Sequence, residues 1–440
     1  MMLSREEKIS GWGRSSVVNA RIYQPEYLSD CKKILSQSRD TLIARGLGRS
    51  YGDCAINRDG GTVVTTQCNR FCVFDATAQT VVCESGVTLR DIQHAFLQHG
   101  LGLVTSPGTA FVTVGGAIAN DVHGKNHDRV GSFSKHVLWL ELLLASGDVI
   151  RCSRFENPRI FFATIGGLGL TGIITIACLQ LQNQSAVVRV TSRSFVDLSA
   201  AIAALREARD TATYHVGWLD LTKKNKTPCV ISIGEPDNTK IIFKKKIPRN
   251  TPYYTSLFLN PVTVSLHNTW HYQKNNSQPF LESLQTFLYP LDSLHRWNRL
   301  YGANGFYQFQ CVIPDSAADE SIAEIINIVK KSDQTCYLAV IKTLGSEGEG
   351  YLSFPLRGVT IALDFPKKNN TRVLLDQLSV VCASAGGRVY LAKDACITPS
   401  LLSIMYPRLF LFRDVLREVD PKARWQSEMS KRLLIRGDDV

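Results

Sequence analysis

The alternation of apolar and polar positions changes along the chain, and the change comes near residue 186. Before it, short β-like runs alternate with brief helical stretches; the runs are Thr62–Thr66, Thr80–Cys83, Phe111–Val114, Val137–Ala145 and Gly172–Gln182. Leu89, Ile92 and Phe96 have the spacing of one helix face, so we expect an amphipathic helix over Leu89–His99 that ends at Gly100. The run at Val137–Ala145 fits either a buried strand or a buried helix.

After residue 186 the apolar positions alternate again, which is typical of strands in a second domain. We expect helices over Asp197–Ala208 and Ala318–Lys331, and strands over Gly305–Pro314 and Gly358–Pro366. Residues 250–279 show few periodic signals and mix aromatic with polar side chains, as lids and membrane-facing loops do. A chain of 440 residues is too long for one typical core, so we expect two domains.

The composition is that of an ordinary globular protein, with 44% hydrophobic and 20% charged residues. No secretory signal is visible at the start, and the longest apolar run is too short to cross a bilayer and carries Glu141. The twelve cysteines lack metal-type spacing, since only Cys68 and Cys72 lie close together. We therefore expect reduced thiols, no bound metal and a cytoplasmic location.

The net charge of +11 is concentrated in one segment. Residues 221–250 hold seven lysines (223, 224, 226, 240, 244, 245 and 246) and Arg249 against two acidic residues, which is over half of that charge. A solvated charged face is the plain interpretation, and contact with an anionic lipid surface or a polyanion is the alternative. Nucleic acid is disfavoured, because no known recognition pattern accompanies the charge.

Two glycine-rich loops carry the candidate chemistry. Ala44–Asp53 and Ser106–His127 both contain glycines next to β-like stretches, where a backbone can approach a bulky or phosphorylated ligand closely. Tyr51 stands where a nicotinamide-type fingerprint expects its third glycine, so that fold is disfavoured. A third turn, Thr164–Ile174, is expected mainly to reverse the chain. We favour one large dinucleotide lying across the first two loops.

Motifs in a fixed order along the chain closely resemble those of the decaprenylphosphoryl-ribose oxidase family. In this sequence they are Gly11–Arg14, Ala44–Asp53, Pro107–Thr109, Val114–Ala119, His123–His127, Gly169–Ile174, Trp297–Gly302, Phe309–Pro314, Asp364–Pro366, Gly386–Asp394, Met405–Arg408 and Val419–Pro421. The resemblance runs from about residue 10 to 436 and is therefore more specific than any single loop. Only the stretch from about residue 222 to 280 does not match clearly.

The resemblance implies an α+β protein in which an FAD-binding domain of the vanillyl-alcohol-oxidase (PCMH) type is joined to a substrate-binding cap domain built on an antiparallel sheet. The expected boundaries are residues 5–185 for the FAD-binding domain, 186–387 for the cap domain, and 388–440 for a C-terminal segment that returns to the first domain. Family members use FAD to oxidise the 2′-hydroxyl of a polyprenyl-phosphoryl ribose to a ketone.

The family's activity also implies partners. A short-chain ketosugar reductase would reduce the ketone and complete an epimerisation to arabinose for cell-envelope glycan synthesis. A quinone-type electron acceptor and peripheral contact with the inner face of the membrane are expected for an oxidase that works on a lipid-linked sugar.

Two positions depart from related sequences. Covalent flavoproteins such as aldonolactone oxidases carry a histidine in a Gly-x-Gly-His-Ser turn, and this chain has Arg49 there, so we expect non-covalent FAD. Some family members place beside the flavin a cysteine that traps nitroaromatic inhibitors, and the matching residue here is Ala362. Oxidation needs neither residue, whereas sensitivity to such inhibitors does depend on the cysteine.

The residues expected to bind FAD come from the glycine-rich turns and from one residue near the C-terminus. They are Arg45, Gly46, Leu47, Gly48, Arg49, Ser50, Tyr51, Gly52, Pro107, Gly108, Thr109, Val112, Gly115, Gly116, Ala117, Asn120, Asp121, His123, Gly124, Gly169, Gly172, Ile173 and Tyr390.

The residues expected to act on the substrate are Lys393, Lys342, His123 and Tyr51. Alcohol oxidation needs a group that takes the hydroxyl proton and a cation that offsets the negative charge reaching the cofactor, and a partly buried lysine such as Lys393 can do either. The expected substrate pocket consists of Tyr289, Gln308, Gln310, Lys342, Ala362 and Lys393.

Two other functions remain open from the sequence. One is an aldonolactone or sugar oxidase with a soluble substrate, which a requirement for a lipid carrier would exclude. The other is a flavoprotein that binds FAD and a partner without turnover, which reduction of the flavin by a substrate would exclude.

Overall fold

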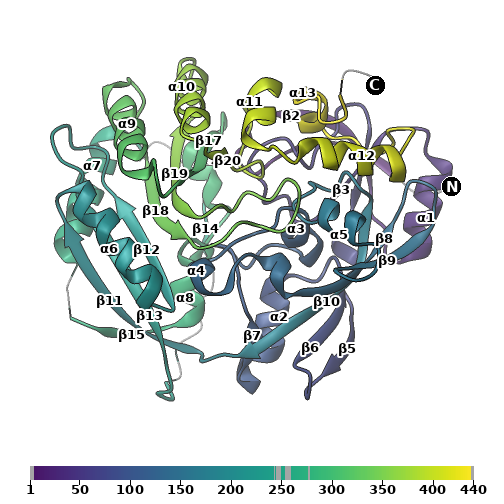
Figure 1. The fold of residues 1–440 in the computed structure, drawn as a ribbon, viewed down its shortest axis with the longest axis horizontal. Coiled ribbons are helices and arrows are strands. Elements are labelled where there is room, and N and C mark those ends of the chain that lie inside the picture. Colours follow the sequence, from purple (N-terminus) through teal and green to yellow (C-terminus); the bar gives the residue numbers. More distant parts are fainter. Residues whose placement is uncertain (1–3, 242, 244–248, 253–258, 276–277, 438–440) are drawn as a thin grey trace.

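The computed structural model describes residues 4–241, 243, 249–252, 259–275 and 278–437, and Figure 1 shows its two halves side by side. Three of the lysines in the basic segment, 244 to 246, lie outside the described residues. None of the helices in the described part of the chain combines the length and the apolar character that a membrane span requires.

The first half contains two sheets. The smaller has the strand order β1-β2-β4-β3, and the larger has the order β5-β6-β10-β8-β9, with β7 added beside β10. Its strands are β1 (Ser4–Ser10), β2 (Val17–Tyr23), β3 (Leu42–Arg45), β4 (Gly61–Val64), β5 (Phe71–Asp75), β6 (Thr80–Glu84), β7 (Leu101–Leu103), β8 (Val137–Leu143), β9 (Val149–Ser153) and β10 (Ile173–Asn183). Its helices are α1 (Leu28–Gln37), α2 (Leu89–Phe96), α3 (Val114–Ala119), α4 (His127–Val130) and α5 (Pro158–Thr164).

The second half is built on one antiparallel sheet of eight strands in the order β15-β11-β13-β12-β18-β19-β17-β20. The strands are β11 (Val187–Phe195), β12 (Tyr214–Leu219), β13 (Cys229–Asp237), β15 (Phe280–Ser283), β17 (Phe306–Pro314), β18 (Leu338–Leu344), β19 (Gly358–Pro366) and β20 (Arg388–Val389). A separate short pair joins β14 (Arg249–Asn250) to β16 (Leu294–His295).

Three helices cover one face of the eight-stranded sheet and leave the other face for the site. They are α6 (Leu198–Thr211), α9 (Ala318–Lys331) and α10 (Thr371–Ser384), which pack on β12, β13, β17 and β19 (Figure 1). Because side chains alternate along a strand, Tyr307, Phe309 and Cys311 of β17 enter the core, whereas Gln308 and Gln310 face the opposite way. Two further helices, α7 (Pro261–Lys274) and α8 (Leu284–Leu288), belong to the same half.

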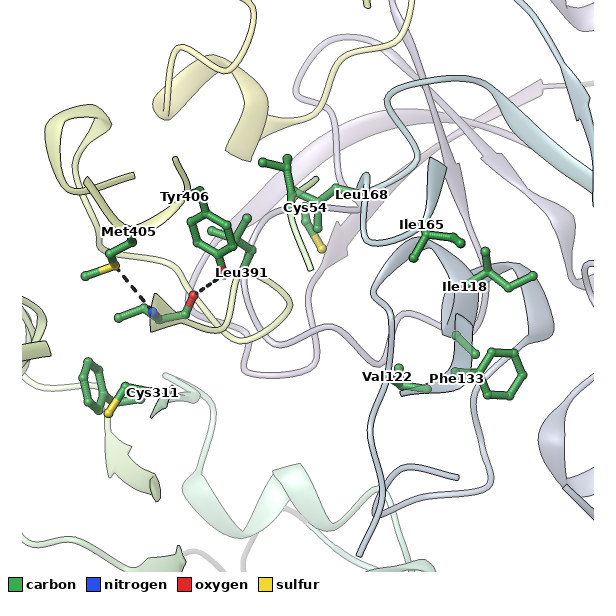
Figure 2. Packing of buried hydrophobic residues seen from close by; sticks show 14 of the residues in the cluster. Cys54, Ile118, Val122, Phe133, Ile165, Leu168, Cys311, Leu391, Met405 and Tyr406 are labelled. Carbon is green, nitrogen blue, oxygen red and sulfur yellow. Dashed lines mark hydrogen bonds between the residues drawn. The ribbon is translucent and has the colours of Figure 1, made fainter. Parts of the chain in front are cut away.

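The C-terminal segment returns to the first half. After α11 (Pro399–Met405), α12 (Leu409–Val419) and α13 (Glu428–Arg432), the buried Trp425 lies beside β3, where the backbones of Arg424 and Gln426 bond to Leu42. Figure 2 shows how the same segment is fixed to β20: the Tyr406 hydroxyl donates to the Val389 carbonyl at 2.7 Å. The Val389 N–H donates to the Met405 sulfur at 3.4 Å.

Most strongly patterned elements are confirmed. The predicted helix at Ala318–Lys331 is α9, the strand at Gly358–Pro366 is β19, and the apolar run from Val137 is the strand β8. Asp197 caps α6 through its bond from the Ala200 N–H, and Gly100 ends the α2 region with a φ of 75°.

Two predictions about local structure are wrong. Phe111–Val114 is no strand, because Val114 already begins α3 and the Thr113 hydroxyl caps it by accepting from the Gly116 N–H. The segment from 250 to 279 contains α7, which carries apolar residues on its buried face (Val264) and on its exposed face (Val262, Leu266 and Trp270), so no single stripe dominates its sequence pattern. Asn260 followed by Pro261 is a readable helix start, and the Asn260 side chain caps α7.

Candidate functional site

A cavity of about 1110 Å³ lies between the loops of the first half and the uncovered face of the eight-stranded sheet. Sites for drug-sized ligands usually occupy about 300–1000 Å³, so this one has room for a dinucleotide or for a cofactor together with part of a substrate. Its walls come from segments far apart in the chain, which meet only in the fold.

Most of the residues predicted to bind FAD line this cavity. They are Arg45, Gly46, Leu47, Gly48, Arg49, Ser50, Tyr51, Pro107, Gly108, Thr109, Val112, Gly115, Gly116, Asn120, His123, Gly124, Gly169, Gly172 and Tyr390. The three glycine-rich turns therefore border one space, including the turn after α5 that the sequence assigned mainly to chain reversal.

Glycines bring the first two turns into contact. A Cβ on Gly46 would lie 2.1 Å from Oγ1 of Thr113, so only a residue without a side chain fits between the turns. Gly48 has a φ of +64°, in the left-handed region that glycine adopts at little cost. The backbone is thus exposed to the cavity where a phosphorylated ligand would need close approach.

The structure places five predicted site residues behind the cavity wall: Gly52, Ala117, Asp121, Ile173 and Tyr289. A Cβ on Gly52 would lie 1.6 Å from the Asp394 carbonyl oxygen, so this glycine joins the loop to the C-terminal segment. Asp121 is buried and accepts from the Ser353 hydroxyl at 2.6 Å, and the Tyr289 hydroxyl lies 2.7 Å from that of Ser106. Ala117 and Ile173 pack in hydrophobic clusters. These residues support the wall and do not face the ligand space.

The second wall comes from the inner face of the eight-stranded sheet. Gln308 and Gln310 of β17, Lys342 of β18 and Ala362 of β19 all face the cavity. The register sets Gln310 directly opposite Ala362, so the predicted pocket residues form one patch. Lys393 joins them from the C-terminal segment, just after β20.

Lysines gather in the cavity wall around His123. The Lys393 ammonium lies 3.4 Å from the centre of the Tyr51 ring, and the Lys342 Nζ donates to the Gly124 carbonyl at 3.0 Å. A third lysine, Lys125, donates to the Phe287 carbonyl and lies 4.4 Å from the centre of its ring. Positive charge from three elements therefore converges on one region.

Burial makes these lysines weaker bases than usual. Desolvation lowers the pKa of Lys342 to about 7 and that of Lys125 to about 8. Desolvation also lowers the pKa of Lys393. The negative charge of Asp364 opposes this lowering, and the positive charge of Lys342 adds to it. An anion bound beside Lys342 and Lys125 would raise their pKa values again and favour their charged forms, so this part of the cavity suits an anionic group.

His123 lies within this group as a neutral ring. Burial, followed by the charge of Lys342, holds its pKa well below the ordinary value. Its Nε2 is 3.2 Å from the side-chain nitrogen of Gln310, and its ring packs against those of Tyr390 and Phe354 with centroids 5.3 Å apart in each case. His123 is therefore suited to hydrogen bonding at neutral pH but not to carrying charge.

The sequence prediction missed two residues that complete the site. Asp364 is fully buried and accepts from the Tyr301 hydroxyl at 2.9 Å and from the Gln308 amide at 2.5 Å, and burial raises its pKa. Lys125 lines the cavity two residues after His123. Both lie inside motifs singled out in the sequence, but only the sheet register and the loop fold show where they are.

The cavity residues fit FAD. The Arg49 guanidinium lies 3.9 Å from the Trp12 ring centre. Its Nε and the Nδ1 atom of His123 are both buried and have no hydrogen-bond partner among the described residues. Such groups need a partner from a ligand or water. A large dinucleotide with an anionic pyrophosphate suits this site. The glycines of the turns allow close approach, and the unpaired polar atoms and the lysines offer partners for it.

Comparison with known proteins agrees with this fit. A family model described as an FAD binding domain matches residues 20–153. The chain is 32% identical to decaprenylphosphoryl-beta-D-ribose oxidase of Mycolicibacterium smegmatis over 97% of each protein. It is 30% identical to a Streptomyces coelicolor protein described as uncharacterized, in the mprA 5′ region, over 79% of this chain and all of that one. It is also 30% identical to L-gulonolactone oxidase of Bos taurus over 39% of this chain and 40% of that one.

These similarities confirm three predictions: the α+β fold with a PCMH-type domain, FAD as the cofactor, and an oxidoreductase that acts on CH–OH groups. The individual roles of the site residues stay predictions. The chain belongs to the decaprenylphosphoryl-β-D-ribose oxidase family.

Proposed function

We propose that the protein oxidises the 2′-hydroxyl of a polyprenyl-phosphoryl ribose to the 2′-keto sugar. The main observation in support of this proposal is the cavity, in which lysines and glutamines adjoin a region lined by apolar side chains of the sheet. A ligand with an anionic phosphate, several hydroxyls and a long apolar chain is complementary to such a surface. The name of the Mycolicibacterium smegmatis relative agrees with this substrate.

In this proposal, Lys393 accepts the proton of the reacting hydroxyl. When bound, FAD supplies the two-electron acceptor for the hydride. The lowered pKa of Lys393 leaves a substantial fraction of its Nζ neutral near pH 7, so that this atom can accept the hydroxyl proton. Gln308 and Gln310 are placed to orient sugar hydroxyls, and Lys342 contributes positive charge beside them.

Three finer expectations belong to the same proposal. A short-chain ketosugar reductase would convert the ketone into the arabinose epimer for cell-envelope glycans. A quinone-type acceptor would reoxidise the cofactor. The basic segment 221–250 would help the protein contact anionic membrane surface at the inner face, and its charge reversal should then weaken binding to anionic liposomes.

The test uses the purified flavoprotein without oxygen. Mixing with a short-chain, water-soluble polyprenyl-phosphoryl ribose should bleach the flavin absorption, whereas the 2′-deoxy analogue should leave it unchanged because it lacks the reacting hydroxyl. Bleaching by L-gulono-1,4-lactone but not by the lipid-linked sugar would instead support a soluble-sugar oxidase, the second candidate that the similarity to L-gulonolactone oxidase favours. A protein that stays colourless with added FAD would contradict both.

A further inference from the structure

Helix α7 presents an apolar stripe to solvent. Val262, Leu266 and Trp270 follow one another at intervals of four residues, and their exposed fractions are 67%, 66% and 55%. Residues four apart lie on one face of a helix, so the three side chains form a continuous strip. Scattered exposed apolar residues are ordinary, but such a strip along one helix marks an interaction surface.

The opposite face holds α7 on the second half. Val264 and Asn268 are buried, and the Asn268 amide donates to the Asp220 carboxylate at 2.9 Å. The Lys223 ammonium donates to the hydroxyls of Ser265 and Thr269 at 3.1 and 2.9 Å. With 3.6 residues per turn, Leu266 lies almost directly opposite Val264 and Asn268. The apolar strip is therefore fixed facing outward.

The strip adjoins the apolar end of the cavity. Trp270 is both exposed and part of the cavity wall, as are His271 and Lys274 on the following turn. Between this helix and the lysine cluster the wall is made by side chains of the sheet, among them Val190, Val216, Trp218, Val230 and Val340. An apolar path thus leads from the outer strip toward Lys342.

The charge around the strip is positive. Helix α7 contains no acidic residue, its last turn carries Lys274, and the Lys274 ammonium lies 4.7 Å from the Trp270 ring centre. Lys223, which holds the helix in place, begins the basic segment. An apolar strip with a Trp and neighbouring lysines has the composition of helices that lie in the interface of an anionic bilayer.

We propose that α7 docks on an anionic lipid bilayer through Val262, Leu266 and Trp270, so that the apolar end of the cavity opens toward the lipid phase. The bilayer is the occupant that explains both the apolar strip and the surrounding positive charge. The proposal rests on the proposed function in one respect only, which is that the apolar ligand entering the cavity from the lipid phase is a polyprenyl tail.

The test compares two double variants of the flavin-loaded protein. Val262→Ser with Leu266→Ser removes apolar surface from the strip, and neither residue lines the cavity. Val373→Ser with Val380→Ser is the matched control, because these valines of α10 are 59% and 54% exposed on a different helix. Binding is measured by co-sedimentation with vesicles of phosphatidylcholine containing phosphatidylglycerol.

The α7 variant should bind these vesicles at least about tenfold more weakly, because it lacks two apolar side chains that would be buried in the bilayer. The control variant should bind like the wild type. Equal binding by all three proteins, or an equal loss in both variants, would overturn the proposal. A wild-type dimer that the α7 variant breaks, without vesicle binding, would assign the strip to a second copy and also overturn it.

Flavin content and melting temperature establish that each variant is folded. Bleaching by the short-chain, water-soluble substrate should be the same in the wild type and the α7 variant, since no membrane is present. Loss of vesicle binding with normal bleaching supports docking. Normal vesicle binding without bleaching would count against the proposed function alone.

Discussion

At the scale of single residues, the site depends on how burial sets the charge of its lysines. Lys393 lies against the Tyr51 ring, and the nearby Asp364 carboxylate is bonded to Tyr301 and Gln308. The negative charge of Asp364 favours the protonated lysine, whereas desolvation and Lys342 favour the neutral one. The balance leaves the pKa of Lys393 near the pH at which enzymes work.

Replacing Lys393 should separate cofactor binding from chemistry. Lys393→Met should keep its flavin, because the glycine turns hold the cofactor, but should reduce the rate of substrate-dependent bleaching by about 10² or more. Stopped-flow absorption measures that rate, and Lys367→Met, outside the cavity, serves as the control. Near-normal bleaching in Lys393→Met would contradict the role assigned to Lys393.

The pH profile provides a second test of the same residue. If the neutral amine takes the proton, the bleaching rate should rise with pH and level off above about pH 7, the pKa to which burial lowers Lys393. Asp364→Asn removes a charge that raises this pKa, so the rise should move to lower pH. Bleaching rates across the pH range give both profiles; a shift to higher pH in the variant would rule out this coupling.

At the scale of elements, a helix cap determines the shape of the cofactor cradle. Thr113 caps α3 through the Gly116 N–H at 3.2 Å, and both residues line the cavity. The same hydroxyl oxygen is the first atom that a Cβ added to Gly46 of the other turn would meet. One threonine therefore sets the position of two cofactor-facing segments.

Thr113→Ala should weaken FAD binding as well as the fold. Losing the cap should lower the free energy of unfolding by about 1 kcal/mol, and the loosened turns should raise the Kd for FAD several-fold. Thr88→Ala is the control, because Thr88 caps α2 in the same way but lies outside the cavity wall. Flavin fluorescence titration and thermal unfolding measure the two effects. A loss of FAD affinity in the control equal to that in Thr113→Ala would contradict the assignment.

Many of the helices and strands could be predicted from the sequence, and there are physical reasons why the others could not. Helix α9 follows from the helical spacing of its apolar residues, and strand β19 from the alternation of its apolar residues with small or polar ones. Helix α7 carries apolar residues on both its buried and its exposed face, so the sequence shows no single dominant stripe there. The short run at Phe111–Val114 resembles a strand locally, but the Thr113 cap overrides that preference. Gly52 and Tyr289 belong to site-forming segments, and which side of a loop faces the ligand is set by tertiary packing alone.

At the scale of the whole molecule, one arginine joins the first glycine-rich turn to the C-terminal segment. Arg432 of α13 bonds to both carboxylate oxygens of Asp53, at 2.9 and 3.0 Å, and to Asp394 at 2.9 Å. Asp53 is the last residue of the first glycine-rich turn, and Asp394 directly follows Lys393. This ion cluster therefore fixes the cofactor turn to the segment that carries the proposed base.

Arg432→Met should destabilise the protein and release its flavin. Removing the cation leaves two buried carboxylates without their partner, which should cost on the order of 2–3 kcal/mol of unfolding free energy, less than for a fully buried cluster because Arg432 is 23% exposed. Arg417→Met is the control, since its pair with Asp414 is 73% exposed at the arginine. Melting temperature and retained flavin measure the outcome; similar behaviour of the two variants would show that the cluster contributes little.

The pairing of Trp425 beside Leu42 has a consequence for biosynthesis. A ribosome makes residue 42 long before residue 425, and β3, which leads directly into the first glycine turn, has no partner on that side until the last part of the chain has emerged. Lys393 and Tyr390 also arrive late. The wall of the FAD cavity is therefore incomplete until these residues have been made, so the early glycine turns cannot form the full pocket without the C-terminal segment.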